Sequence, residues 1–249
     1  MDPEEYARMF RIEQTHWWYL GMARITRTIL DKWFAAGVDR QILDAGCGTG
    51  SAMASYLSEY GTVTGIDLSP IALAFCRERR LTSLARASVV ELPFKTASFD
   101  LVTSFDVLYE QGVQSDVASM GELFRVLRPD GLLLIRLPAY DWLRGQHDLT
   151  VHTARRYTVS RVKQLLGDNG FSILRASYAN TFLFPLAVAK RLFERISAPA
   201  PHTSDLSVKT GSFNGLLKNI LGSEAVLIPF IGLPYGLSVI VLAKKPSCL

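Results

Sequence analysis

Apolar and polar residues follow one another over the first 140 positions in a pattern that predicts strands separated by helices. Short apolar or β-branched runs predict five strands, at residues 41–45, 62–67, 87–90, 99–105 and 132–137. The stretches 51–60, 69–80 and 115–127 have helical character. Strands that alternate with helices form right-handed crossover units, so this half predicts a parallel, doubly wound α/β sheet.

The two flanks of this core predict further elements. Residues 3–34 predict one or two helices, and the second half predicts a helix at 160–170, a strand at 171–177, an amphipathic helix at 178–196 and a last strand at 236–243. Residues 198–212 are rich in Pro, Ser and Thr and predict a loop. Residues 226–243 carry no charge, but four Pro and Gly residues interrupt them, which favours a bend and a strand over a membrane-spanning helix.

Composition narrows the class of protein. The chain has 249 residues, of which 49% are apolar and 20% charged, so it is long and apolar enough for one large folded domain and is not a disordered chain. Its three cysteines do not suggest a disulfide framework. The first ten residues are acidic, unlike a secretory signal. Together these features favour a cytoplasmic protein.

Charge is divided unevenly along the chain. Residues 1–143 contain 14 Lys and Arg against 18 Asp and Glu, whereas residues 144–249 contain 13 against 5. A basic half indicates either an anionic partner, such as a phosphate, a carboxylate, a membrane surface or nucleic acid, or simply a solvated basic face. There is no run of consecutive basic residues typical of a nucleic-acid tail.

A glycine-rich turn after the first strand carries the first candidate chemistry. Gly46, Gly48 and Gly50 follow Asp44, and Asp67 ends the second strand 23 residues after Asp44. Glycines allow a ligand to approach the backbone at a helix N-terminus, and an acid at the second strand can bind both hydroxyls of a ribose. The spacing is neither that of a dinucleotide loop nor that of a P-loop. These residues therefore predict a nucleoside ligand without a pyrophosphate.

Four segments in order resemble class I S-adenosylmethionine (SAM)-dependent methyltransferases of the small-molecule "type 11" family. They are DAGCGTG at 44–50, GIDLSP at 65–70, ELPFKTASFDLV at 91–102 and ELFRVLRPDGLLLIRLP at 122–138. The resemblance implies a Rossmann-like class I methyltransferase fold, with a seven-stranded, mostly parallel sheet and an antiparallel last strand. It also implies SAM as the cofactor and S-adenosylhomocysteine as its product.

The resemblance assigns expected roles in cofactor binding. The loop at 46–50 would lie against the methionine part of SAM, Asp67 would bind the ribose and Leu68 would flank the adenine. Ser88 stands where the family often has an Asp that contacts the adenine amine, so backbone around Val89 is expected to replace part of that contact. The full expected set is Tyr19, Asp44, Gly46, Cys47, Gly48, Asp67, Leu68, Ser88, Val89, Ser104 and Phe105.

The segments before and after the central α/β core are expected to determine substrate specificity. His16-Trp17-Trp18 resembles a segment of a subset of the family in which N-terminal helices form a lid over the SAM pocket. We therefore predict a helical lid at 1–36 and a methyltransferase domain at 37–249, with substrate-facing insertions at 139–160 and 178–225. The two Trp residues either contact the sulfonium and exclude water or only staple the helix to the domain. Expected substrate-binding residues are Trp17, Trp18, Tyr109, His152, Arg156 and Tyr157.

Three residues are candidates for a general base. His147 is preferred because a neutral imidazole accepts a proton near pH 7, and Asp106 and Glu110 are the alternatives. A reaction that depends only on proximity and orientation needs no base, and His147 would then only order its loop. His147, Asp148 and His152 lack a fourth ligand, so no metal site is expected.

The sequence thus predicts direct methyl transfer from SAM to an oxygen, nitrogen or carbon of a small-molecule, lipid-like or glycan-type acceptor. The basic, amphipathic segment at 178–195 favours an anionic or membrane-borne acceptor and a peripheral membrane contact. The alternative is an enzyme that binds SAM on the same scaffold and catalyses a cyclisation or rearrangement without methyl transfer. A nucleic-acid substrate is not expected, because no Asn/Asp-Pro-Pro-aromatic signature of base-amine methylation is present.

Overall fold

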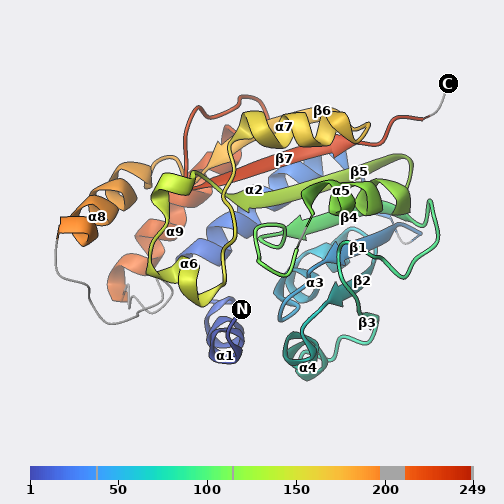
Figure 1. Cartoon of the computed structure of the whole chain (residues 1–249), viewed down its shortest axis with the longest axis horizontal. Helices are drawn as coiled ribbons and strands as arrows, with labels where there is room; N and C mark the ends of the chain where they lie inside the picture. The colour runs from blue at the N-terminus through green and yellow to red at the C-terminus, as the bar shows by residue number, and fades with distance from the viewer. Residues whose placement is uncertain (38, 114, 197–210, 248–249) are drawn as a thin grey trace.

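Helices cover both faces of one seven-stranded sheet in the computed structural model (Figure 1). The structure describes residues 1–37, 39–113, 115–196 and 211–247, without the side chains of 146, 147 and 194–196. The predicted loop at 198–212 therefore lies almost wholly outside the described residues.

The sheet has the strand order β3-β2-β1-β4-β5-β7-β6. Every neighbouring pair is parallel except those that β7 forms with β5 and β6, which confirms the predicted fold class and its antiparallel last strand. The strands are β1 (Gln41–Ala45), β2 (Thr62–Asp67), β3 (Leu84–Arg86), β4 (Phe99–Phe105), β5 (Leu127–Pro138), β6 (Ser172–Ala179) and β7 (Ser238–Lys244).

Successive strand residues point to opposite faces, so the sheet supports two apolar cores. Ile42 of β1 packs with helices α2 and α9, whereas its neighbour Leu43 packs with the core that α5 and α7 cover. The described helices are α1 (Pro3–Ile12), α2 (Trp17–Trp33), α3 (Ser51–Ser55), α4 (Pro70–Glu78), α5 (Asp116–Val126), α6 (Gln146–Thr150), α7 (Val159–Asp168), α8 (Phe184–Ile196) and α9 (Asn214–Ser223).

Some residues of the N-terminal segment, 1–36, pack in the core, and others line the cavity described below. Met22, Ile25 and Ile29 of α2 are buried against the sheet because they recur at helical spacing on one side of the helix. The cavity is lined by residues of α1, by Glu13, Gln14 and His16 after it, and by α2 as far as Arg27. The predicted lid at 1–36 therefore includes a helix that is part of the main fold.

The strand predicted at 87–90 and the helix predicted at 178–196 are wrong in their bounds. The third strand lies at Leu84–Arg86 rather than 87–90, because its parallel partner β2 pairs with these residues from Gly65 to Asp67. The helix predicted at 178–196 begins only at Phe184, because β6 continues to Ala179 in its pairing with β7. Long-range strand pairing decides both limits.

The uncharged stretch at 226–243 forms the predicted bend and strand. It passes through turns after a 3-10 segment, Glu224–Val226, and enters β7 at Ser238. The helix α9 before it was not predicted; Leu221 on it packs closely on Gly21 of α2. In the described part of the chain, every helix is too short or too polar to cross a bilayer.

Candidate active site

The glycine loop has the tight, left-handed turns that its residues allow. Gly46, Gly48 and Gly50 have φ of 87°, 55° and 79°, a region that side-chain-bearing residues rarely adopt. The N–H groups of Gly46 and Cys47 both donate to the Ile66 carbonyl at 2.8 Å. This pairing brings the loop after β1 next to the end of β2.

Gly46→Ala is expected to destabilise the fold by about 2 kcal/mol. A Cβ at this position would lie 2.2 Å from Cγ2 of Val107 and would sit on a backbone with positive φ. Chemical denaturation measures the change, and Gly121→Ala is the matched control because open space surrounds that position. Equal loss of stability in both variants would contradict the packing argument.

Asp67 joins the two strand ends at the cavity. Its Oδ2 accepts the Gly48 N–H at 2.9 Å and its Oδ1 accepts the Ser69 N–H at 2.8 Å. Burial raises the pKa of this carboxyl, and the backbone hydrogen bonds oppose that shift. Asp67 thus sits at the carboxyl end of β2, bonded to the loop and facing the cavity.

Asp44 lies deeper, at the end of β1. Only 2% of the residue is exposed, and the Thr103 hydroxyl donates to its Oδ1 at 2.8 Å. Burial raises the pKa of Asp44 to about 6. Because the carboxylate is poorly solvated, a cationic ligand group in the cavity would stabilise its charged form.

One large cavity of about 1120 Å³ opens beside these residues. Most of the predicted site residues line it: Trp17, Trp18, Tyr19, Asp44, Gly46, Cys47, Gly48, Asp67, Leu68, Ser88, Val89, Phe105, Asp106, Tyr109, Glu110 and Arg156. Residues far apart in sequence are thus brought to one cavity at the carboxyl edge of the sheet, where parallel α/β sheets bind ligands.

Three predicted site residues lie outside the cavity lining. The buried Ser104 hydroxyl donates to the Ala45 carbonyl at 2.9 Å, and the buried Tyr157 hydroxyl donates to the Leu108 carbonyl at 3.1 Å. His152 is exposed, with its Nε2 3.0 Å from Asp2 Oδ1. These contacts give all three a structural role. His147 belongs to α6, but its side chain is not among those described.

The Cys47 thiol beside the loop is not an ionised nucleophile. The Sγ atoms of Cys47 and Cys76 are 3.9 Å apart, and both residues are buried. Their mutual hydrogen bond and burial raise the pKa of the Cys47 thiol. Among the residues that the structure describes, no three His, Cys, Asp or Glu side chains gather as a metal site would require.

Arg136 is a site residue that sequence analysis missed. It lies on β5, is 8% exposed and faces the cavity. Its Nε donates to Asp106 Oδ2 at 2.7 Å, and its guanidinium lies over the rings of Trp18 and Phe105 at 4.8 and 5.0 Å. The signal was present, because a charged residue interrupts the apolar run LLLIRL. Asp106 is therefore already paired with a cation.

Glu110 is placed differently from Asp106. It is partly buried, and its nearest cation among the described groups is the Met1 ammonium, at 4.0 Å. Burial raises the pKa of Glu110 to about 7, and the negative charge of Asp67 acts in the same direction. A carboxyl group with such a pKa can accept a proton at neutral pH.

A buried ion pair fixes the N-terminal segment over the glycine loop. The Thr49 hydroxyl donates to the Glu13 carboxylate, with distances of 2.6 and 2.7 Å to its two oxygens, and Arg79 pairs with the same carboxylate. Arg79 also donates to the Thr49 carbonyl at 3.0 Å and lies 4.4 Å above the Phe10 ring. The carboxylate thereby ties the joint between α1 and α2 to the loop and to the end of α4.

Glu13→Gln is expected to lower the stability by about 2 kcal/mol and to weaken ligand binding at the loop. The amide keeps the size of the side chain but leaves Arg79 without its buried counter-ion. Thermal unfolding with and without SAM measures both effects. Glu4→Gln, an exposed change on α1, serves as the control and should have no effect. An unchanged unfolding temperature of the Glu13 variant would show that the ion pair does not hold the N-terminal segment over the glycine loop.

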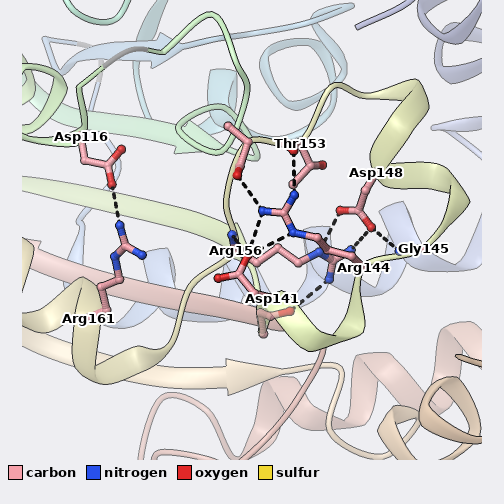
Figure 2. A network of polar contacts seen from close by, with 10 residues as sticks. Asp116, Asp141, Arg144, Gly145, Asp148, Thr153, Arg156 and Arg161 are labelled. Carbon is pink, nitrogen blue, oxygen red and sulfur yellow. Dashed lines mark hydrogen bonds and ion pairs between the residues drawn. The ribbon is translucent and has the colours of Figure 1, made fainter. Parts of the chain in front are cut away.

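A network of polar contacts connects the loop after β5 (Figure 2). Arg156 forms a bidentate salt bridge with Asp148, with N–O distances of 2.8 and 2.9 Å, and donates to the Ala139 carbonyl at 3.0 Å. Burial disfavours the Asp148 carboxylate, but the hydrogen bonds and charge of Arg156 outweigh it and lower its pKa. Arg156 lines the cavity, as its predicted role in substrate binding requires. Its positive charge is already paired with the Asp148 carboxylate.

The strand order, the glycine loop and the acid at the end of β2 define a Rossmann-like class I methyltransferase fold. Residues 43–135 match a family model described as "Methyltransferase domain", so this part of the chain is a methyltransferase domain.

A relative from Mycolicibacterium smegmatis, a "Probable S-adenosylmethionine-dependent methyltransferase", is 30% identical over 138 residues, which are 54% of this chain and 52% of that protein. The chain spans about half or less of the length of the first curated relatives that it matches.

Solved structures share the fold at low identity. The putative methyltransferase complexed with the Trm112 activator of Haloferax volcanii superposes with a TM-score of 0.63 and 18% identity, covering 99% of this chain and 96% of that one. The [4+2]-cyclase SpnF superposes with a TM-score of 0.57 and 20% identity, covering 91% and 81%.

Proposed function

We propose that this protein is a SAM-dependent methyltransferase that binds SAM between the glycine loop and Asp67. The observation that carries the proposal is the hydrogen bond that ties the Gly48 N–H to Asp67 at the wall of the cavity. The Gly48 and Ser69 N–H groups orient Asp67 there, as binding of two ribose hydroxyls requires. The methionine amine of SAM would lie toward Asp44, whose buried carboxylate gains from a nearby cation.

The other wall of the cavity supports an acceptor with a large apolar part. Leu183, which precedes α8, and Leu186 and Ala187 on α8 face the cavity, with Leu217 of α9 and Ala23 of α2. The basic side chains of Arg24, Lys190 and Arg191 line the cavity as well. We therefore favour an amphiphilic acceptor that combines an apolar chain with an anionic group, in agreement with the basic second half of the chain.

Methyl transfer is an in-line displacement, in which the acceptor nucleophile attacks the methyl carbon and the sulfur leaves as a thioether. The aromatic side chains of Trp18, Tyr19 and Tyr109 at the cavity attract the sulfonium and exclude water. Glu110 would remove the proton of a hydroxyl or amine nucleophile. The chain's own residues thus provide binding, orientation and a proton acceptor.

Formation of S-adenosylhomocysteine tests the proposal. The purified chain is incubated with SAM and with the aqueous or the chloroform-soluble fraction of a cell extract, and S-adenosylhomocysteine is quantified. We expect it to form with the chloroform-soluble fraction and to be absent without extract. Binding of SAM without S-adenosylhomocysteine in any fraction would instead favour a cyclisation or rearrangement that retains the methyl group.

A further inference from the structure

Helix α8 is apolar along most of its length but has no buried residue between Phe184 and Phe193. It lies at the margin of the molecule, away from the sheet (Figure 1). Leu186 is 66% exposed, Leu192 51% and Phe193 71%. A helix with apolar side chains on several sides is normally buried in a protein or in lipid. Its composition therefore indicates that this surface meets an apolar partner.

Apolar side chains from neighbouring segments extend this surface. The rings of Trp142 and Tyr235 lie 6.2 and 5.3 Å from that of Phe184, and both residues are nearly half exposed. A shallow groove of about 390 Å³ runs between Tyr235 and α8 and is lined by Phe184, Pro185, Val188, Ala189, Leu192 and Tyr235. Phe213 and Leu216, beside and on α9, are also exposed. The exposed apolar residues of α8 thus form one patch with Trp142 and Tyr235.

Basic residues accompany the patch. Lys190 and Arg191 lie on α8 between the exposed Leu186 and Leu192, and Lys218 is exposed on α9. The excess of basic over acidic residues in the chain is confined to residues 144–249, which include these elements. Apolar and basic side chains side by side match the interface of a bilayer with anionic headgroups. A second copy on the same patch would bring like charges together, which disfavours a dimer.

We propose that α8 and its apolar surroundings dock on an anionic lipid bilayer. Helix α8 has 13 residues, so it is about 20 Å long and too short to span the hydrocarbon core. It would therefore lie in the plane of the interface, with Leu192 and Phe193 among the acyl chains and the basic side chains at the phosphates. This anchoring is peripheral.

The docked orientation places the cavity beside the membrane. Leu186, Ala187, Lys190 and Arg191 of α8 line the cavity as well, so the same helix borders both the lipid and the site. An amphiphilic acceptor dissolved in the bilayer would reach the cavity past α8. This consequence rests on the proposed methyl transfer, whereas docking itself does not.

Flotation with lipid vesicles, in the absence of SAM, tests the docking. The purified chain is mixed with vesicles of phosphatidylcholine alone or of three parts phosphatidylcholine to one part phosphatidylglycerol. We expect binding to the anionic vesicles, weaker binding to the neutral ones, and release by salt. The double variant Leu192→Glu/Phe193→Glu should bind the anionic vesicles at least about tenfold more weakly than the unmodified chain. Neither residue lines the cavity.

Val117→Glu is the matched control, because Val117 is 61% exposed and lies on α5, away from α8 (Figure 1). It should bind vesicles like the unmodified chain. Equal binding of the double variant and the control, or no binding of the unmodified chain to anionic vesicles, would overturn the proposal. Sedimentation equilibrium gives a further check: a dimer that only the double variant dissociates would assign the patch to a second copy instead. SAM affinity should be the same in all variants, so a failure of docking is distinguishable from a failure of the proposed reaction.

Discussion

Asp67→Asn is expected to lower the affinity for SAM about a hundredfold. Two hydrogen bonds from ribose hydroxyls to a carboxylate would become bonds to a neutral amide, and each charge-assisted bond is worth about 1.5–3 kcal/mol. The variant would also disturb the glycine loop, because Asp67 accepts the Gly48 N–H as well. Isothermal titration calorimetry with SAM and with S-adenosylhomocysteine measures the change.

Asp100→Asn provides the matched control for Asp67. Asp100 accepts hydrogen bonds from the Gln41 N–H and from Arg128, but it does not line the cavity. The same chemical change there should reduce stability without reducing SAM affinity. If both variants bind SAM like the unmodified chain, Asp67 does not hold the ribose.

Glu110→Gln is expected to slow methyl transfer at least about a hundredfold while SAM affinity is retained. Glutamine keeps the shape of the side chain but cannot accept the proton of the nucleophile. Because burial raises the pKa of Glu110 to about 7, the carboxylate form, which is the active one, is lost as the pH falls through that value. The rate of the unmodified chain should therefore rise with pH up to about 7 and then level off.

The pH dependence of S-adenosylhomocysteine formation, in the presence of the acceptor fraction that supports turnover, measures this effect. Glu91→Gln, at an exposed position, is the control and should keep both the rate and the profile. A Glu110 variant with an unchanged rate would remove Glu110 as the base. If His147→Ala then lost activity with SAM affinity intact, the imidazole would take that role.

Local signals were sufficient to predict that the glycine loop and Asp67 lie together. Tight glycine turns and an acid at a strand end need only a few adjacent residues, and the structure brings Gly48 and Asp67 together as expected. The parallel sheet followed from alternation of strands and helices in the same way. The roles of these residues in SAM binding stay predictions until the affinities are measured.

Contacts between distant segments could not be predicted. Arg136 and Asp106 are 30 positions apart, and Glu13 and Arg79 are 66 apart; only the closed fold brings each pair together. Tyr157 contains the aromatic and polar groups of a ligand contact, but the fold buries it. Likewise, the residues at 178–179 have no sequence signal for a strand, and their pairing with β7 decides their conformation.

Transfer of an isotopically labelled methyl group tests the central claim most directly. The purified chain is incubated with SAM that carries a trideuterated methyl group, and the aqueous and chloroform-soluble products are compared by mass spectrometry. The account predicts a chloroform-soluble product with the intact trideuterated methyl, formed in equal amount with S-adenosylhomocysteine and lost in Glu110→Gln. Binding and retention of SAM with no deuterium in any product would contradict it.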